Sequence, residues 1–212
     1  MHDSNFTLNE SYWAPVPEEA FQKDASPWIT YPASKVLAEK ATWDFVDEHP
    51  ELDIITLLGA YILGPIAEDQ VLKDLATLSS NFWIYQLIGG QRAAYPDLDK
   101  SPQFIDVRDV ARAIVLSLSA APRRSGKHPL ILLSNEVLDW TAAAKEVAKI
   151  SPQVKARTVD RGAVTGRRGA VIDTTRANEI LGLDKFIPWE EMVVNGVTSI
   201  LENEWKIQLQ VA

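Results

Sequence analysis

The chain has 212 residues, of which 46% are hydrophobic and 24% are charged, as in an ordinary globular protein. Its formal net charge of −8 argues against a protein that binds a nucleic-acid backbone, because such proteins normally present a basic face. No apolar run approaches the ~18 residues that a membrane-spanning helix needs. The absence of cysteine excludes disulfides, thiolate catalysis and cysteine-ligated zinc.

The sequence predicts no metal site and no secretory leader. The three histidines, His2, His49 and His128, lie far apart and lack the spacing of metal ligands. The first residues lack the charged and apolar regions of a signal peptide, so the cytoplasm is the expected compartment.

The first strong helical pattern follows a polar, proline-broken stretch of 30 residues, which is predicted to be surface loop with one short helical turn. A helix is predicted from Tyr31 to Glu48, with Thr30 as its N-cap. Four apolar residues spaced by four would form its buried stripe: Ala33, Leu37, Ala41 and Phe45. Residues 53–58 are almost wholly apolar, which predicts a strand buried on both faces of a parallel sheet.

The later elements alternate in the same way. The chain is expected to leave the sheet over Gly59 to Pro65, and residues 66–90 carry a helical pattern. A brief strand at 104–105 should lead into a helix over 107–118, with Asp106 as its N-cap and Asp109 in its first turn. A buried strand is predicted at 130–133, and helices at 140–150, 173–183 and 189–205. This alternation is typical of the α/β class.

Tyr31 and Lys35 are the first candidates for chemistry, because residues four apart on a helix emerge from one face. A neighbouring ammonium favours the ionised form of a phenol, whose ordinary pKa is about 10. A tyrosine tuned in this way can exchange a proton with a carbonyl oxygen or an alcohol near neutral pH. The spacing alone is common, and an exposed amphipathic pair is its more frequent explanation.

The chain as a whole resembles the extended short-chain dehydrogenase/reductase family, within the NAD-dependent epimerase/dehydratase superfamily. It is most similar to the branch of the dihydroflavonol reductases and the fungal ketone, aldehyde and methylglyoxal reductases. The resemblance covers nearly the whole chain in the right order. It rests on YPASKVLAEKA at 31–41, Gly64-Pro65, FIDVRDVA at 104–111, NEILG at 178–182 and the closing tryptophan-rich helix.

The resemblance implies the C-terminal part of a Rossmann-like doubly wound parallel sheet together with a small α-rich substrate lobe. Residues 1–65 would be a remnant of the nucleotide-binding domain. Residues 66–212 would be the substrate lobe, interleaved with returning sheet elements at about 103–135. The implied activity is the NAD(P)H-dependent reduction of a small-molecule aldehyde or ketone, with NADP(H) favoured over NAD(H).

The same resemblance assigns roles to individual residues. Tyr31 would protonate the carbonyl oxygen, and Lys35 would lower the pKa of Tyr31 and bind the nicotinamide ribose. Gly59 and Ile62 would line the nicotinamide pocket, where family members usually carry proline at the position of Gly59, so this wall should be more flexible here. The substrate would face the region around Phe82, Tyr85 and Tyr95.

The family binds its cofactor through a glycine-rich turn near the N-terminus, and no such turn precedes Tyr31. The sequence therefore resembles an N-terminally truncated member that also lacks the family's catalytic Ser or Thr. Ser4 and Ser11 lie in polar loop sequence, and neither is expected to replace that group. The glycine-rich segment 162–169 lacks a preceding strand and is predicted to be a solvated basic loop.

An incomplete sheet would expose apolar edges, which favour self-association, and the isolated chain is expected to bind NADPH weakly or not at all. One alternative is a non-catalytic remnant that docks on a partner. Another is an enzyme whose true start lies upstream of Met1. A third is an epimerase or dehydratase of the kind that acts on sugar nucleotides.

Overall fold

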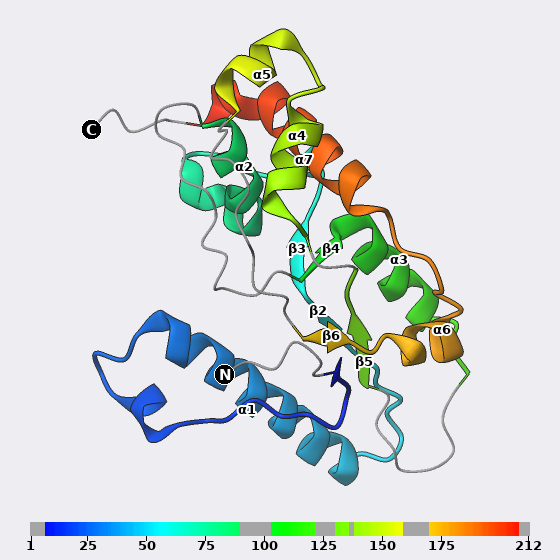
Figure 1. Ribbon diagram of the computed structural model, residues 1–212. Helices are drawn as coiled ribbons and strands as arrows, with labels where there is room; N and C mark the ends of the chain where they lie inside the picture. The colour runs from blue at the N-terminus through cyan, green and yellow to red at the C-terminus, as the bar shows by residue number, and fades with distance from the viewer. Residues whose placement is uncertain (1–6, 90–102, 122–129, 136–137, 159–169, 208–212) are drawn as a thin grey trace.

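The computed structural model describes residues 7–89, 103–121, 130–135, 138–158 and 170–207 (Figure 1). Within these ranges the strands form three parallel pairs. They are β1 (Thr7–Leu8) with β6 (Val171–Ile172), β2 (Thr56–Gly59) with β5 (Leu130–Leu133), and β3 (Tyr61–Leu63) with β4 (Phe104–Asp106). Parallel pairs whose strands are separated by helices confirm the predicted α/β class.

Strands β2 and β3 form one nearly continuous extended stretch that pairs with two different neighbours. The N–H of Ala60 donates to the carbonyl of Leu133 at 2.9 Å, and the N–H of Tyr61 donates to the carbonyl of Gln103 at 3.2 Å. The chain therefore changes its neighbour from β5 to β4 between these two residues. The prediction that the chain leaves the sheet over Gly59 to Pro65 is wrong for residues 61–63, which pair in register with β4, and the strand ends at Leu63.

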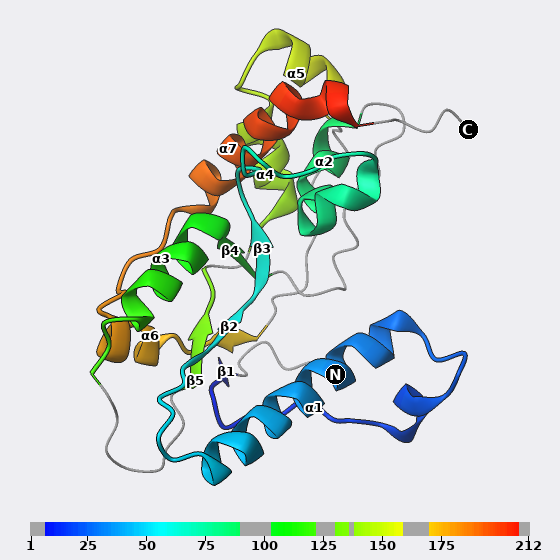
Figure 2. The same ribbon diagram turned by 180° about the vertical axis from the view of Figure 1, so that it is seen from behind.

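The strand predicted over 53–58 exists, but it begins at Thr56 and is not buried on both faces. Leu57 packs on buried residues beneath the sheet, whereas Leu58, which points to the opposite face, is 37% exposed. Burying both faces requires a covering layer on each side. In Figures 1 and 2, helices α3 (Val107–Ser117) and α6 (Thr175–Leu181) lie on one side of β2 and β5, and α1 (Pro27–Glu48) lies on the other.

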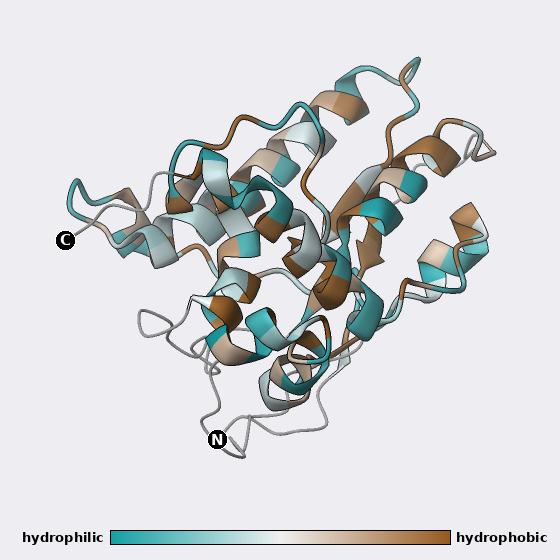
Figure 3. Ribbon diagram, turned by 90° about the horizontal axis from the view of Figure 1, so that it is seen from above, coloured by the Kyte–Doolittle hydropathy of each residue, from teal (hydrophilic) through white to brown (hydrophobic). Residues whose placement is uncertain are grey.

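Most of the buried apolar residues in the described part of the chain form two separate clusters. The sheet core lies between the strands and helices α3 and α6, and it consists of Ile105, Ala113, Ile131, Leu133, Ala177, Leu181 and Leu183. The helical core is larger and is built mainly from α2 (Phe82–Ile88), α4 (Trp140–Val147), α5 (Pro152–Arg157) and α7 (Trp189–Asn203), which gather at one end of the molecule (Figure 1). Seen from above, the helices of the molecule carry both hydrophobic and hydrophilic residues, as amphipathic helices do (Figure 3).

Helix α1 begins four residues earlier than predicted. The hydroxyl of Ser26 accepts from the N–H of Trp28 at 3.3 Å, and Pro27 occupies the first helical position. Serine followed by proline is a strong helix start, which explains why Thr30 is not the cap. The Thr30 hydroxyl instead donates to the carbonyl of Ser26 at 3.3 Å.

The predicted buried stripe of α1 is wrong beyond its first member. Ala33 is 2% exposed, but Leu37 is 42% exposed, Phe45 is 50% exposed and Ala41 is exposed as well. Val36, which lies outside the predicted stripe, is the other buried residue of this helix. Burial needs a packing surface as well as an apolar face, and α1 lies apart from the helices that form the larger core (Figures 1 and 2).

Most of the later elements match their predictions. Strand β4, strand β5 and helices α3, α4, α6 and α7 lie where they were expected, with ends that differ by at most three residues. The side chain of Asp106 accepts from the N–H of Arg108 at 2.8 Å, which confirms the predicted N-cap of α3. Gly182 ends α6 with φ +65°.

The helical pattern predicted over 66–90 is only partly correct. The structure contains a 3-10 helix, η2 (Leu75–Asn81), followed by α2, and residues 66–74 are not helical. The side chain of Asp74 caps η2 by accepting from the N–H of Thr77 at 3.0 Å, so the helical stretch begins only there. Other unpredicted elements are β1, β3, β6, α5 and the 3-10 helix η4 (Glu204–Lys206). The predicted domain boundary at residue 65 stays a prediction.

Candidate functional site

Tyr31 and Lys35 lie side by side in the first turns of α1. The Lys35 ammonium is 5.3 Å from the centroid of the Tyr31 ring, and 64% of Tyr31 is exposed. The carbonyl of Tyr31 accepts an additional hydrogen bond from the Ser34 hydroxyl at 2.7 Å. The structure thus brings together the acid and the cation that the sequence singled out, on a surface that a substrate can reach.

A second cation–aromatic pair on the same helix provides a comparison for the first. The Lys40 ammonium lies 5.4 Å from the centroid of the Trp13 ring, which belongs to the segment that precedes α1. This pair connects the N-terminal segment to the helix but contains no phenol. Lys40 is therefore a matched control for Lys35.

Gly59 and Ile62, the predicted wall of the cofactor pocket, are neighbours at the point where β2 passes into β3. Gly59 is exposed, and Ile62 is 38% exposed. A Cβ placed on Gly59 would lie 3.5 Å from the side chain of Ile62, which is an ordinary contact distance. An open backbone beside an aliphatic side chain is chemically suited to the face of a planar ring. Their role as a cofactor wall stays a prediction.

The start of α2 is attached directly to this wall. The Ser80 hydroxyl donates to the carbonyl of Ile62 at 2.5 Å. The Asn81 side chain accepts from the N–H of Gly64 at 3.1 Å and donates to the carbonyl of Gly64 at 2.9 Å. Gly64 has φ +129°, and a Cβ there would meet side-chain atoms of Val107 and Asp106 at 3.1–3.3 Å, so the residue must be glycine.

The three aromatic residues predicted to face the substrate have different surroundings. Phe82 opens α2 and is 37% exposed, whereas Tyr85 is 7% exposed and its hydroxyl donates to Glu204 at 3.3 Å. Arg157 donates to the two carboxylate oxygens of Glu204 at 2.8 and 2.6 Å, and these bonds hold the pKa of Glu204 below its usual range. The substrate roles of Phe82 and Tyr85 stay predictions, and Tyr95 lies outside the described residues.

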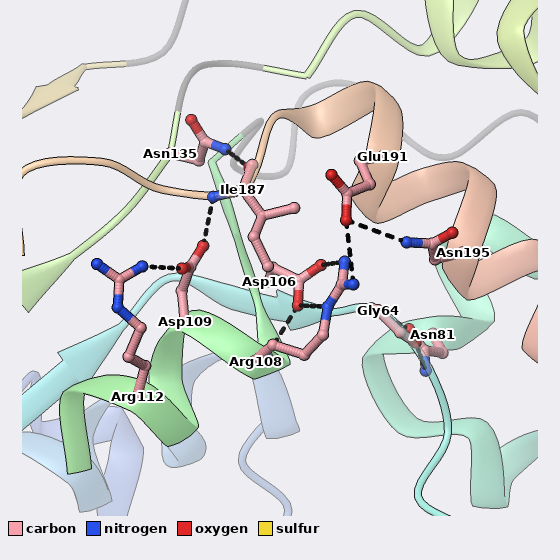
Figure 4. A network of polar contacts seen from close by, with 10 residues as sticks. All are labelled: Gly64, Asn81, Asp106, Arg108, Asp109, Arg112, Asn135, Ile187, Glu191 and Asn195. Carbon is pink, nitrogen blue, oxygen red and sulfur yellow. Dashed lines mark hydrogen bonds and ion pairs between the residues drawn. The ribbon is translucent and has the colours of Figure 1, made fainter. Parts of the chain in front are cut away.

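A polar junction between β4, α3 and α7 was missed as a unit by the sequence reasoning (Figure 4). Asp106 is fully buried, and its carboxylate accepts from Arg108 Nε and Nη2, each at 2.9 Å. The remaining guanidinium nitrogen of Arg108 donates to Glu191 at 3.1 Å. The hydrogen bonds to Asp106 raise the pKa of Arg108 above its ordinary value. The only local sequence signal for this junction was the segment Asp106-Val107-Arg108-Asp109, which lies where β4 passes into α3.

Asp109 forms a second part of this polar junction. Only 1% of it is exposed, and its carboxylate accepts from the N–H of Ile187 at 2.7 Å. Arg112 lies 3.6 Å from the other carboxylate oxygen. Burial is the largest influence on Asp109, and it raises the pKa of the carboxyl. The Asn135 amide donates to the carbonyl of Ile187 from the opposite direction.

A hollow of about 430 Å³ lies at the β1–β6 pair, away from the Tyr31–Lys35 pair. Its lining consists of Thr7, residues 171–175, Asn178, Leu183 and Asp184. Of the two serines considered as replacements for a catalytic hydroxyl, Ser11 is exposed and donates to the side chain of Asn9 at 2.6 Å. Ser4 and the basic loop at 162–169 lie outside the described residues.

The described residues form neither a metal-binding cluster nor a membrane-spanning helix. No group of three or more His, Cys, Asp or Glu side chains there is arranged to hold a metal ion. No helix in the same ranges has both the length and the apolar character needed to cross a bilayer.

Comparison with known proteins places these observations in a family. The model of the NAD dependent epimerase/dehydratase family matches residues 12–131, more than half of the chain. The NADPH-dependent methylglyoxal reductase GRE2 of Saccharomyces cerevisiae is 27% identical over 97% of this chain and 60% of its own length. A putative uncharacterized oxidoreductase of Schizosaccharomyces pombe is 36% identical over 70% of this chain and 43% of its own length.

Solved structures show the same likeness. Yeast methylglyoxal/isovaleraldehyde reductase Gre2 in complex with NADPH matches with a TM-score of 0.71 and 25% identity, over 95% of this chain and 59% of its own. Gre2 of Candida albicans with NADPH matches with a TM-score of 0.75 and 24% identity, over 94% and 59%. These likenesses to Rossmann-fold reductases confirm the predicted fold class. The chain spans about 60% of the length of the methylglyoxal reductases it matches.

Proposed function

The chain belongs to the NAD dependent epimerase/dehydratase family, and we propose that it carries the proton-donating helix of an NADPH-dependent reductase of small aldehydes or ketones. The observation that supports this proposal is the exposed Tyr31 phenol with the Lys35 ammonium beside it at 5.3 Å from the ring. Relatives that are named methylglyoxal reductases support the substrate class. The proposed cofactor is NADPH because those relatives are named as NADPH-dependent.

In the proposed reaction Tyr31 donates the phenolic proton to the carbonyl oxygen of the substrate. NADPH, when bound, supplies a hydride to the carbonyl carbon, so that hydride and proton together convert the C=O group to an alcohol. The Lys35 ammonium stabilises the phenolate that remains, because the two groups sit on one face of the helix. The other N–H donors of the Lys35 ammonium would bind the ribose hydroxyls of the cofactor.

Two further residues would hold the nicotinamide. Gly59 leaves an open stretch of backbone, and the half-exposed Ile62 side chain lies beside it, so the pair fits a planar ring. The attachment of Ser80 and Asn81 to this segment would keep α2, and with it Phe82, in a constant position relative to the nicotinamide. Cytoplasmic residence and self-association remain predictions, and exposed apolar residues such as Leu37 and Phe45 supply a surface for the latter.

The test is the oxidation of millimolar NADPH by the 212-residue chain with methylglyoxal as the probe substrate. Tyr31→Phe removes the proton donor and should lower turnover by at least about 100-fold. Lys35→Met should lower it as well, whereas Lys40→Met, which breaks the cation–aromatic pair with Trp13 on the same helix, should leave it unchanged.

Three outcomes contradict the proposal. Equal turnover by the unaltered chain and by Tyr31→Phe would remove Tyr31 from the chemistry. NADPH is used at millimolar concentration because no glycine-rich turn precedes Tyr31 and weak binding is expected. No NADPH oxidation by the unaltered chain even at that concentration would overturn the proposed activity of this chain and favour the non-catalytic alternative. Interconversion of a sugar nucleotide without net oxidation of the cofactor would instead identify an epimerase.

A further inference from the structure

The sheet core and the helical core meet at the polar junction shown in Figure 4, which the proposed reaction does not use. We infer that Arg108 is a positioning residue that locks the two cores together, so that they open and unfold as one unit. The inference rests on contacts of the described residues and holds whether or not the chain is an active reductase.

Strand β4 carries consecutive residues into both cores. Phe104 belongs to the helical core, and Ile105, on the opposite face, belongs to the sheet core. The next residue, Asp106, is fully buried at the end of the strand and caps α3. A buried carboxylate requires a cationic partner. Because β4 ends with Asp106 buried between the two cores, a cation must pair with Asp106 at this position.

Arg108 satisfies Asp106 and at the same time reaches across to the other core. Two of its nitrogens donate to Asp106, and the third donates to Glu191 in the first turn of α7. With the Asn195 amide turned by 180°, its oxygen also accepts from Arg108 Nη1 at 3.2 Å and from Nη2 at 3.3 Å. A planar guanidinium with several fixed donors suits such a bridge, which lysine does not reproduce.

The segment before α7 is held by an independent pair of contacts. Asp109 of α3 accepts from the N–H of Ile187, and the Asn135 amide, just beyond β5, donates to the carbonyl of the same residue. Helix α7 is therefore attached to the sheet side at Ile187 and again one turn later at Glu191. Moving the cores apart would break charge-assisted hydrogen bonds at both points.

This arrangement has a consequence for the proposed site. Phe82 and Tyr85 lie on α2, and Tyr85 belongs to the helical core, whereas Gly59 belongs to β2, which pairs with β5. If the two cores opened independently, the distance between the predicted substrate region and the predicted cofactor wall would vary. The Arg108 bridge acts together with the contacts of Ser80 and Asn81 to the strand, and so helps to keep these regions in one relative placement.

The test compares the amide hydrogen exchange of α3 with that of α7 by mass spectrometry. In the unaltered protein the slowest amides of both helices should report the same global unfolding. Glu191→Ala combined with Asn195→Ala removes the bridge to α7 but keeps the Asp106–Arg108 pair, so the variant should still fold. We expect α3, which packs on the smaller sheet core, to exchange about fivefold to tenfold faster relative to α7.

Glu190→Ala is the matched control, because Glu190 lies in the same first turn and makes the same charge contribution to the start of the helix. This control should leave the ratio of the two exchange rates unchanged. The inference is overturned if the double variant speeds exchange equally in both helices, which would mean that Arg108 adds only to overall stability. It is also overturned if Glu190→Ala changes the ratio by the same factor.

Discussion

Helices α1 and α7 both carry apolar residues at helical spacing, but only α7 buries them. In α7 the buried residues are Met192, Val193, Gly196, Val197 and Ile200, which form one continuous face. In α1 only Ala33 and Val36 are buried. The comparison shows that spacing defines a face, whereas burial depends on a second surface that packs against it. The candidate proton donor lies on the exposed helix, where a substrate can reach it.

The largest expected effect is the loss of a side chain from the buried face of α7. Ile200 is fully buried in the helical core, so Ile200→Ala should lower the free energy of unfolding by about 3 kcal/mol through lost burial and a residual cavity. Urea denaturation followed by circular dichroism measures the change. A loss below about 1 kcal/mol would show that the helical core collapses around the gap.

A close contact on the same face should have the next largest effect. A Cβ added at Gly196 would lie 2.5 Å from Ile84 Cδ1 and 3.4 Å from the carbonyl oxygen of Gly64. Gly196→Ala should therefore destabilise the protein by about 1–3 kcal/mol through overpacking. Ile84→Val deletes the Cδ1 atom, so the double variant should be more stable than the sum of the two single changes predicts. If the effects of the two changes on thermal unfolding were simply additive, the destabilisation by Gly196→Ala would not come from its contact with Ile84.

The end of α7 offers a pH-dependent test. Arg157 holds the pKa of Glu204 below its ordinary value, so the folded protein binds that proton less tightly than the unfolded chain does. The pair therefore stabilises the fold above the unfolded pKa of 4.5, and this contribution is lost as the pH falls through the folded pKa. Glu204→Gln should cost about 1 kcal/mol at pH 7 after solvent screening, and the difference from the unaltered protein should shrink below pH 4.5. A difference that stays constant with pH would contradict the assignment.

The smallest effect is expected on the exposed helix. Leu37 of α1 has 42% of its surface exposed, and Leu37→Ala should change the free energy of unfolding by no more than about 0.5 kcal/mol. The same denaturation experiment that measures Ile200→Ala provides the comparison. A loss of 2 kcal/mol or more, about that of a core leucine, would show that this face of α1 is covered in solution, for example in a self-associated form.

Elements with strong local signals could be predicted from the sequence because the determining contacts lie within a few residues. The Asp106 cap of α3, strand β5, the glycine end of α6 and the stripe of α7 are of this kind. The start of α1 was missed because two acceptable caps, Ser26 and Thr30, compete within four residues, and only the one followed by proline is used. The exposure of Leu37 could not be predicted, since the sequence of a helix does not state what packs against it.

The candidate site likewise combines contacts that follow from the local sequence with contacts that depend on the tertiary structure. The sequence by itself determined that Tyr31 and Lys35 lie together, because residues four apart on a helix share a face regardless of the rest of the fold. Only the tertiary structure decided that Ile62 stays in a strand and that Arg108 reaches Glu191, a residue 83 positions away. Local geometry follows from the backbone of a few residues, whereas long-range contacts depend on which surfaces the whole chain brings together.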